Sequence, residues 1–363
     1  MLKWVYSKRK PLEQRSAQTP QSSRWSHHRN MDLHKRPTRD DVARRAGVSS
    51  AVVSYVLNNG PRPVADCTRQ KVLDAVKELK YRPNSAARAF RLQKSNSIGL
   101  LVPDISNPFF AELARAVREA ASAYGCALIL NDSGSTSSIT QDQIRFISEH
   151  QPDGVIIIGR TAQTNLEALR TNHIRCVALD AAQTDTHIPT VSINNYVGAL
   201  SGIEHLLQHG HDQIAMIAGS DRSIAADARI QAWHDATGIP ITSPLLKRSD
   251  YSREGGLRAC QELLESGLEF TALFVASDIQ AVGALRALHE ASIAVPRDCA
   301  IVSFDGTQEA RFTTPPLTVI EQPLTTMAER ALALLFENSK EKLSSVIVEH
   351  SLSIRDSCGC SCT

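Results

Sequence analysis

From Ser97 onward the chain alternates short apolar runs with amphipathic stretches, and this alternation limits the fold to one class. The apolar runs are SIGLLV, CALILN, GVIIIG, CVALD, QIAMIA, ALFVA and AIVSF. Runs of about four to eight apolar residues between helical patterns are typical of parallel strands buried on both faces. The helical patterns are PFFAELARAVREAASAY, TNLEALRTN, NYVGALSGIEHLLQHG, SREGGLRACQELLESG and DIQAVGALRALHEA. The sequence therefore predicts a doubly wound α/β fold.

This α/β part is too large for one ordinary sheet. It covers residues 96–356, and single cores stop growing near about 250–300 residues, so we expect two lobes. The whole chain has 363 residues and is 42% hydrophobic, which excludes a wholly disordered protein and leaves room for a further domain.

A pair of short helices is predicted ahead of the α/β part, in TRDDVARRAGVSSAVVSYVLNN. Thr38 is a good N-cap, and Asp41 three residues later completes an acidic capping box. Gly47 follows the first apolar face, where a left-handed residue usually ends a helix. Ser49 can cap a second helix, Ser50 to Asn58, with valines at helical spacing. Two such helices around a Gly turn are typical of a helix-turn-helix.

A third helix and a short joint follow this pair. Asp66 to Lys80 places Val72, Ala75, Val76 and Leu79 on one face. Pro83 ends this helix at Arg82. Asn84 can then cap a short helix, SAARAFRL, which is marginal alone because isolated helices under about 12 residues are unstable in water.

The charge is divided unevenly along the chain. Residues 1–95 hold 21 Lys and Arg against 7 Asp and Glu, a net of 21 − 7 = +14. Residues 96–363 hold 19 against 31, a net of 19 − 31 = −12, and the sum is +2. A basic head on an acidic body indicates nucleic-acid binding by the head, although a solvated basic tail would give part of the same excess.

The order DVARRAGVS, VVSYVLN, TRQKVLDAVKELKYRPN, ARAFR and IGLLVPDISNPFF resembles the lactose-repressor/galactose-repressor (LacI–GalR) family of bacterial transcription regulators. The resemblance runs from about Thr38 to Arg355. It implies a periplasmic-binding-protein-like body, with chain crossings between lobes near Asn194, Ile320–Pro323 and Asn338. The expected division is a disordered tail (1–34), a helix-turn-helix head (35–82), a hinge (83–95), an effector-binding body (96–356) and a Cys-containing tail (357–363). Where the family usually has a Ser cap this chain has Ala65, and Asp66 is expected to take over.

The resemblance also implies which residues meet DNA. In the second helix, Ser50, Ala51 and Tyr55 point away from the valines and match base-reading positions of the major groove. Many family members carry Arg where this chain has Tyr55. Expected phosphate contacts, which set register, are Thr38, Ser49, Ser54 and Asn58; the alternative for Ser49 is a plain helix cap. The hinge contacts are Asn84, Ala87, Arg88 and Phe90, with Phe90 as an apolar wedge in the minor groove; alternatively, Phe90 packs on the body.

Effector contacts follow from the same resemblance. Asn107, Phe109 and Phe110 resemble a segment that places aromatic rings against a sugar in ribose-type binding proteins, although one Phe can instead belong to the core. Arg229, Asp278 and Gln322 match binding positions by motif. Asp278 also begins a helix, so its alternative role is an N-cap. Weaker candidates are Asp180, Tyr251 and Asp305. Relatives often carry Arg where Ala181 follows Asp180.

Two groups of cysteine and histidine residues bear on metal binding. The five cysteines before the tail lie in apolar segments and are predicted to be buried free thiols. The tail CGCSCT could bind metal or pair with another chain, but it lacks a second ligand cluster at zinc spacing, so a passive tail is favoured. His205, His209 and His211 lie near a helix C-terminus, where cationic side chains are favoured without any metal. We therefore predict no metal and no cofactor.

The predicted function is a DNA-binding regulator controlled by a sugar or related metabolite. The family resemblance implies that it is a repressor, which is the commoner outcome. We expect a homodimer on a near-palindromic operator. A transport solute-binding protein is the alternative, but no secretory signal is seen and the head would have no role. An enzyme is disfavoured because the chain lacks a G-x-S-x-G elbow, a P-loop and HExxH. No apolar run reaches membrane-spanning length, and we expect a cytoplasmic protein with reduced thiols.

Overall fold

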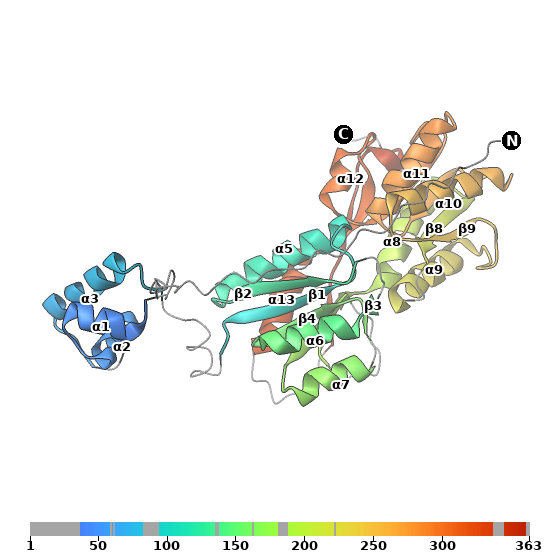
Figure 1. The fold of residues 1–363 in the computed structure, drawn as a ribbon. Helices are drawn as coiled ribbons and strands as arrows, with labels where there is room; N and C mark the ends of the chain where they lie inside the picture. The colour runs from blue at the N-terminus through green and yellow to red at the C-terminus, as the bar shows by residue number, and fades with distance from the viewer. Residues whose placement is uncertain are drawn as a thin grey trace, which may run out of the picture. The chain divides into compact units, whose positions relative to one another are not determined.

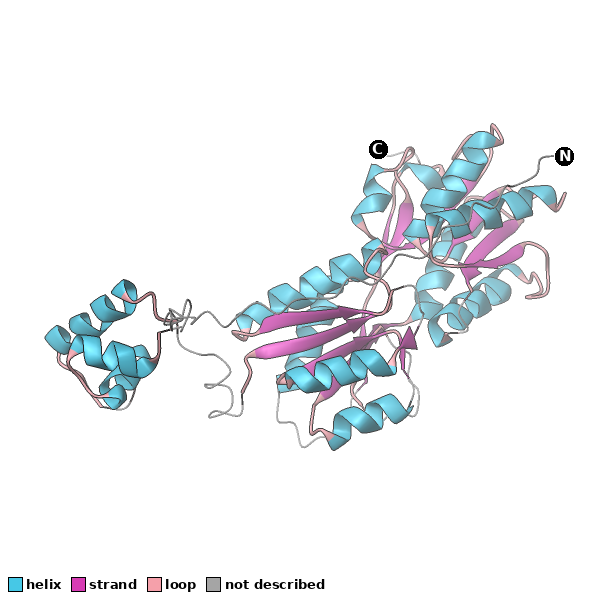
Figure 2. Ribbon diagram, viewed as in Figure 1, coloured by secondary structure: helices cyan, strands magenta, loops and turns pink. Residues whose placement is uncertain are grey.

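The computed structural model describes residues 37–58, 60, 62–82, 94–134, 138–161, 163–180, 188–220, 223–336 and 345–360 (Figures 1 and 2). The chain divides into two compact units, Met1–Pro83 and Asn84–Thr363, which we call the head and the body. The predicted tail over residues 1–34 and the hinge residues 83–93 lie outside the described residues.

The head contains the three predicted helices, α1 (Arg39–Ala46), α2 (Ser50–Leu57) and α3 (Asp66–Glu78). The capping box between Thr38 and Asp41 is present, and Gly47 ends α1 in the left-handed conformation at φ 68°. Ser49 caps α2. The core consists of Val42, Ala43, Val53, Val56, Val72 and Ala75. The expected N-cap role of Asp66 is wrong, because Ala65 occupies that position without a side-chain hydrogen bond and Asp66 is already helical.

The body contains two parallel sheets, one in each lobe. The N lobe has the order β13-β7-β6-β4-β1-β2, and the C lobe has the order β14-β12-β11-β10-β8-β9, in which only β14 is antiparallel to its neighbour. The N-lobe strands are β1 (Ser97–Val102), β2 (Ala127–Asp132), β4 (Gly154–Ile158), β6 (Cys176–Leu179), β7 (Thr190–Ile193) and β13 (Ser345–Val348). The C-lobe strands are β8 (Ile214–Gly219), β9 (Leu246–Ser249), β10 (Ala272–Val275), β11 (Ala300–Asp305), β12 (Thr318–Glu321) and β14 (Ser351–Ser353). A small pair, β3 (Ser138–Ile139) and β5 (Arg160–Thr161), forms a separate ribbon.

Helices cover both faces of each sheet (Figure 1). In the N lobe, α5 (Pro108–Ala123) and α13 (Leu324–Phe336) lie on one face, and α6 (Gln141–His150) and α7 (Gln163–Thr171) lie on the other. In the C lobe, α8 (Asn195–Gln208) pairs with α9 (Ile224–Thr237), and α10 (Arg253–Glu265) pairs with α11 (Asp278–Glu290). Two short elements, α12 (Gln308–Phe312) and the 3₁₀ turn η1 (Asp356–Cys358), complete the C lobe. The doubly wound, two-lobed prediction is confirmed.

The chain passes between the lobes three times. Two crossings, at Asn194 and directly after β12, are those expected. The third was expected near Asn338, which lies outside the described residues. That expectation is wrong, because β13 still belongs to the N lobe, where it pairs with β7. The chain crosses at Glu349–His350, between β13 and β14.

Two further details bear on the predictions. Of the cysteines predicted to be buried, Cys176, Cys260 and Cys299 are buried, whereas Cys126 is half-buried and Cys67 is exposed. Cys67 lies on the solvent side of α3, away from the small head core. Among the described residues, no helix is both long and apolar enough to cross a membrane.

Candidate functional site

The exposed side of α2 carries the predicted base-reading residues. Val53 and Val56 are buried, so the helix turns Ala51 to solvent. Ser50 is half-buried, and its hydroxyl donates to Asp40 of α1. Tyr55 is also half-buried, because its ring packs over Gly60, where an added methyl would lie 2.5 Å from Cδ1 of the ring. Gly60 therefore fixes the position of Tyr55 at the rim of the helix.

The predicted phosphate contacts lie at helix ends. Thr38 and Ser49 are the N-caps of α1 and α2, and both are exposed. Nδ2 of Asn58 donates to Ser54 Oγ at 3.2 Å and to the Ser54 carbonyl oxygen at 2.9 Å at the end of α2. Helix N-termini suit phosphate oxygens because their N–H groups lack intrahelical partners. The hinge contacts Asn84, Ala87, Arg88 and Phe90 lie outside the described residues.

A group of buried polar side chains lies at the carboxyl ends of the C-lobe strands, with Arg229 at its centre. Nε and Nη2 of Arg229 donate to Oδ1 of Asn195 at 2.9 and 2.8 Å, and Nη1 donates to the carbonyl oxygen of Ala276 at 2.6 Å. The guanidinium carbon lies 3.7 Å from the centre of the Phe304 ring. These contacts hold the charge in one orientation, as recognition of a polar ligand requires.

Asp305 and Gln322 lie beside this arginine. Nε2 of Gln322 donates to Asp305 Oδ1 at 2.9 Å. Oε1 of Gln322 is buried and has no hydrogen-bond partner among the described residues. Burial raises the pKa of Asp305 well above its usual range; the charge of Arg229 lowers it, and the charges of Asp278 and Asp180 raise it further. Since Asp180 follows β6 of the N lobe, carboxylates of both lobes meet at this junction.

Asp278 is fully engaged by its own lobe. Oδ1 accepts from the hydroxyl of Ser303 at 2.6 Å, and Oδ2 accepts from the N–H and hydroxyl of Thr307 at 2.7 and 2.8 Å. Burial raises the pKa of Asp278 to about 6, and these hydrogen bonds oppose the rise. The suggested N-cap role is wrong, because Ser277 caps α11 and Asp278 is the first helical residue.

The N-lobe candidates begin α5. Asn107 caps this helix, and its Oδ1 accepts from the N–H of Phe109 at 3.0 Å. Phe109 is buried, whereas Phe110 is half-buried and meets it edge to face at 5.3 Å between ring centres. Phe109 therefore belongs to the core, and Phe110 is the better candidate for ligand contact.

The remaining candidates lie at strand ends. Asp180 has a positive φ of 53° directly after β6. Tyr251 is half-buried and packs on Gly219 at the end of β8, where an added methyl would lie 2.3 Å from its hydroxyl oxygen. Because ligands of parallel α/β folds bind at the carboxyl ends of strands, both positions suit a site at the lobe junction. A hollow of about 440 Å³ lies between α13 and β13, and none of the predicted effector residues lines it. Pro323, the neighbour of Gln322, is one of its lining residues.

Sequence reasoning missed Asn195, Ser303 and Thr307, which position Arg229 and Asp278. The one signal for Asn195 is its place directly after Asn194, at the first crossing. It also missed a contact between the lobes, in which the N–H of Gln308 donates to Oε1 of Glu112 at 2.8 Å.

Comparisons with known proteins agree with this architecture. Residues 38–84 match the family model of bacterial regulatory proteins, lacI family, and residues 95–355 match that of periplasmic binding proteins and sugar binding domain of LacI family. Catabolite control protein A of Priestia megaterium is 32% identical over 325 residues, covering 87% of this chain and 98% of that protein. The HTH-type transcriptional repressor PurR of Actinobacillus pleuropneumoniae serotype 3 (strain JL03) is 32% identical over 305 residues, covering 83% and 90%.

Among solved structures, the lac repressor dimer bound to operator and the anti-inducer ONPF superposes with a TM-score of 0.78 at 27% identity, covering 89% of this chain and 99% of that one. A helix-turn-helix head on a two-lobed ligand-binding body defines a DNA-binding transcription regulator. The chain belongs to the lacI family of bacterial regulatory proteins.

Proposed function

We propose that this regulator is a repressor whose operator affinity is set by a sugar or related polyhydroxy metabolite bound at the junction of the two lobes. The observation that carries the proposal is the buried polar group of Arg229, Asp305 and Gln322. In this proposal the carboxyl oxygens of Asp305 accept hydrogen bonds from ligand hydroxyls, and the guanidinium of Arg229 donates hydrogen bonds to the oxygens of those hydroxyls. Phe110 offers an aromatic face to the apolar face of a sugar ring.

The matched family models support this ligand class, since one of them is described as a sugar binding domain. Nucleosides and purine bases also present flat rings and several polar groups, so they belong in the same screen. A transport solute-binding protein is not favoured, because the capped α2 of the head would then have no role.

For the DNA, we propose a homodimer on a near-palindromic operator, acting in the cytoplasm. Among the described residues of the head, one short helix, α2, is proposed for base contacts, and two copies at fixed spacing double these contacts. The solved lac repressor dimer bound to operator supports this arrangement by similarity. We propose that Ser50, Ala51 and Tyr55 contact base edges and that Thr38, Ser49, Ser54 and Asn58 contact phosphates.

Two measurements test the proposal. A thermal-shift screen of sugars, nucleosides and purine bases identifies the effector, since a ligand at 100 times its dissociation constant stabilises the body by about 2.7 kcal/mol. Gel shifts with DNA upstream of the protein's own gene then measure whether that ligand changes operator binding. A stabilising ligand whose affinity is unchanged in Arg229→Ala and Gln322→Ala would move the site elsewhere. If the protein showed no preference for any DNA sequence, the proposed role as an operator-binding regulator would be excluded.

A further inference from the structure

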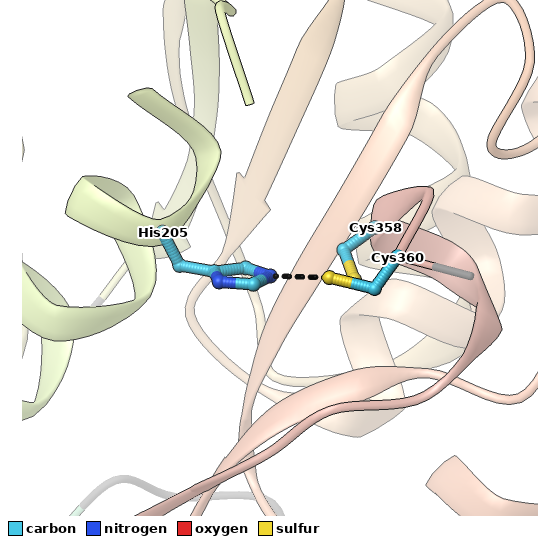
Figure 3. A group of neighbouring side chains, drawn as sticks. All are labelled: His205, Cys358 and Cys360. Carbon is cyan, nitrogen blue, oxygen red and sulfur yellow. Dashed lines mark hydrogen bonds between the residues drawn. The ribbon is translucent and has the colours of Figure 1, made fainter. Parts of the chain in front are cut away.

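The last described residues of the chain lie against the C-terminal end of α8, and together they form a cluster of nitrogen and sulfur ligands (Figure 3). The ligand atoms of His205, Cys358 and Cys360 all lie within 4.8 Å of one another. Sγ of Cys360 lies 3.6 Å from Nε2 of His205 and 3.0 Å from Nε2 of His209. Sγ of Cys360 therefore lies next to both imidazoles, and Sγ of Cys358 lies within 4.8 Å of Cys360 and His205, although the histidines and cysteines are separated by about 150 residues of sequence.

We propose that His205, His209, Cys358 and Cys360 form a tetrahedral site for a transition-metal ion of the Zn²⁺ class. The separations agree with this geometry. Zinc bonds of about 2.3 Å to sulfur and about 2.0–2.1 Å to nitrogen place tetrahedral ligand atoms roughly 3.3–3.8 Å apart. The two sulfur–nitrogen distances of Cys360, 3.6 and 3.0 Å, lie close to that range, and rotation of the exposed His209 ring would complete the set of four ligands.

Each ligand pair is arranged by local structure. His205 lies in the last turn of α8, and His209 is its C-cap, so the two rings share one face of the helix with centres 4.7 Å apart. Cys358 ends η1, and Gly359 follows at φ 87°, a left-handed conformation that turns the chain before Cys360. The spacing Cys-Gly-Cys thus delivers two thiols to the same histidine pair.

The cysteine segment is also anchored to the C-lobe sheet. The hydroxyl of Ser357 donates to the Ile301 carbonyl at 2.7 Å, and the Thr318 N–H donates to Ser357 Oγ at 2.8 Å. The Thr318 hydroxyl donates to Sγ of Cys358 at 3.1 Å, and Cys358 is 1% exposed. A hydrogen bond to the sulfur orients a thiolate ligand and stabilises its charge. Cys358 is therefore held in place before any metal arrives.

The ligand set selects the class of ion. Thiolate and imidazole ligands suit Zn²⁺ and chemically similar ions, whereas Mg²⁺ and Ca²⁺ require oxygen ligands. On binding, the S–H bonds of Cys358 and Cys360 release their protons to solvent and two sulfur–metal bonds form. Two thiolates then balance the charge of a divalent ion, so the largely buried site is neutral. His209 is exposed and leaves a route from solvent.

Bound metal would fasten the C-terminal segment to α8, within one lobe. The inference is independent of the effector and the operator, since it concerns the opposite end of α8 from Asn195. The four proposed ligands fill the tetrahedral positions, which indicates a structural site rather than a catalytic one with an open position.

The test uses the reduced full-length chain without a His tag, stripped with a chelator and titrated with Co²⁺. We expect saturation at one equivalent, with the intense visible bands of tetrahedral cobalt and a sulfur-to-cobalt charge-transfer band. Added Zn²⁺ should abolish both. Cys360→Ser and His209→Ala should each weaken Co²⁺ affinity by more than the roughly 10–100-fold that loss of a supporting group costs.

Cys126→Ser is the matched control, because Cys126 is a half-buried thiol of the other lobe, and it should keep both bands. Cys360 and His209 are chosen because both are partly or fully exposed, so their variants fold; circular dichroism verifies this. The proposal is overturned if the reduced wild type shows no charge-transfer band with excess Co²⁺, or if Cys360→Ser keeps the wild-type spectrum and affinity. A Cys358–Cys360 disulfide that persists in reducing buffer would overturn it as well.

Discussion

Oδ1 of Asn195 accepts two hydrogen bonds from the same guanidinium, that of Arg229, at 2.9 and 2.8 Å. Asn195 begins α8 directly after the first crossing between the lobes, and Arg229 lies in α9. The planar fork of an arginine can share one acceptor in this way, whereas the single ammonium of lysine cannot. This pair therefore joins the proposed effector site to the segment that connects the lobes.

We expect Arg229→Lys to weaken effector binding strongly while operator binding remains. The variant keeps the charge but loses the fork, and each polar group left unpaired costs about 1–3 kcal/mol. Calorimetry with the ligand identified in the screen measures the loss. Arg258→Lys, an exposed arginine of α10, is the control and should bind normally. Equal affinities in the two variants would show that Arg229 does not support the site.

Asp278 predicts a pH dependence of body stability. Its pKa in the folded protein is about 6, above the usual 3.8, so the folded state holds a proton that the unfolded state has released between these values. The contribution of Asp278 to the free energy of unfolding is fully present below about pH 4. It is lost as the pH rises through about 6, at up to about 1.4 kcal/mol per pH unit. Urea unfolding at several pH values measures the slope. Asp278→Asn should flatten it, and an unchanged slope would contradict the raised pKa.

Operator binding should weaken steeply with salt. Several Lys and Arg displace counterions from the phosphates, and a protein with 6–10 phosphate contacts loses about 10³–10⁵ in affinity between 50 and 200 mM salt. Fluorescence anisotropy over this range tests the expectation, with a scrambled sequence as the control. A flat response would contradict the phosphate contacts proposed for the head.

Phe90→Ala should reduce specific binding and operator bending. An apolar wedge in the minor groove unstacks a base step and bends the duplex, at least cost where the central step is pyrimidine–purine. Circular-permutation gel shift measures the bend. Nonspecific binding and the ligand-induced thermal shift serve as controls and should stay unchanged. Wild-type bending by the variant would favour packing of Phe90 on the body.

Gly283→Ala should destabilise the C lobe. In the crossing of α10 and α11, a methyl group on Gly283 would lie 2.0 Å from the carbonyl oxygen of Arg253, and one on Gly256 would lie 2.0 Å from that of Gln280. The helices meet backbone to backbone there, so a methyl forces them apart at about 1–3 kcal/mol or more. Thermal unfolding measures the effect. Arg286→Ala, at an exposed position of α11, should change stability little.

The sequence predicted the strands with continuous apolar runs, including the edge strand β2, and it missed the short strands β7, β9, β12, β13 and β14. All seven apolar runs lie in strands, and all of these strands except β2 are buried throughout, as expected for strands covered by helices on both sides. β9 has the sequence LKRS and lies at a sheet edge, half-buried or exposed, so its pattern carries no such signal. β13 is also a half-buried or exposed edge strand, and its run SVIV is only four residues long. The third crossing was misplaced because this strand was missed.

For the sites, local patterns predicted positions but not partners. The caps at Thr38, Ser49 and Gly47 depend on neighbouring residues and are confirmed. The hydrogen bonds between Asp278 and Thr307 depend on how distant strands are placed, which no local spacing reveals. In the same way, no spacing in the sequence links His205 to Cys358, because only the fold brings them together.

The late return of the chain to the N lobe affects how the protein is made. Leu335 of α13 packs on Gly154 of β4, and a ribosome adds Leu335 about 180 residues after Gly154. At roughly 5–20 residues per second, the interval is on the order of ten to forty seconds. Throughout it, the sheet face that α13 covers is apolar and open, while the strands of the C lobe are still being synthesised. The lobe that emerges first therefore waits for α13 and β13 until all of the C lobe except β14 and η1 has been synthesised.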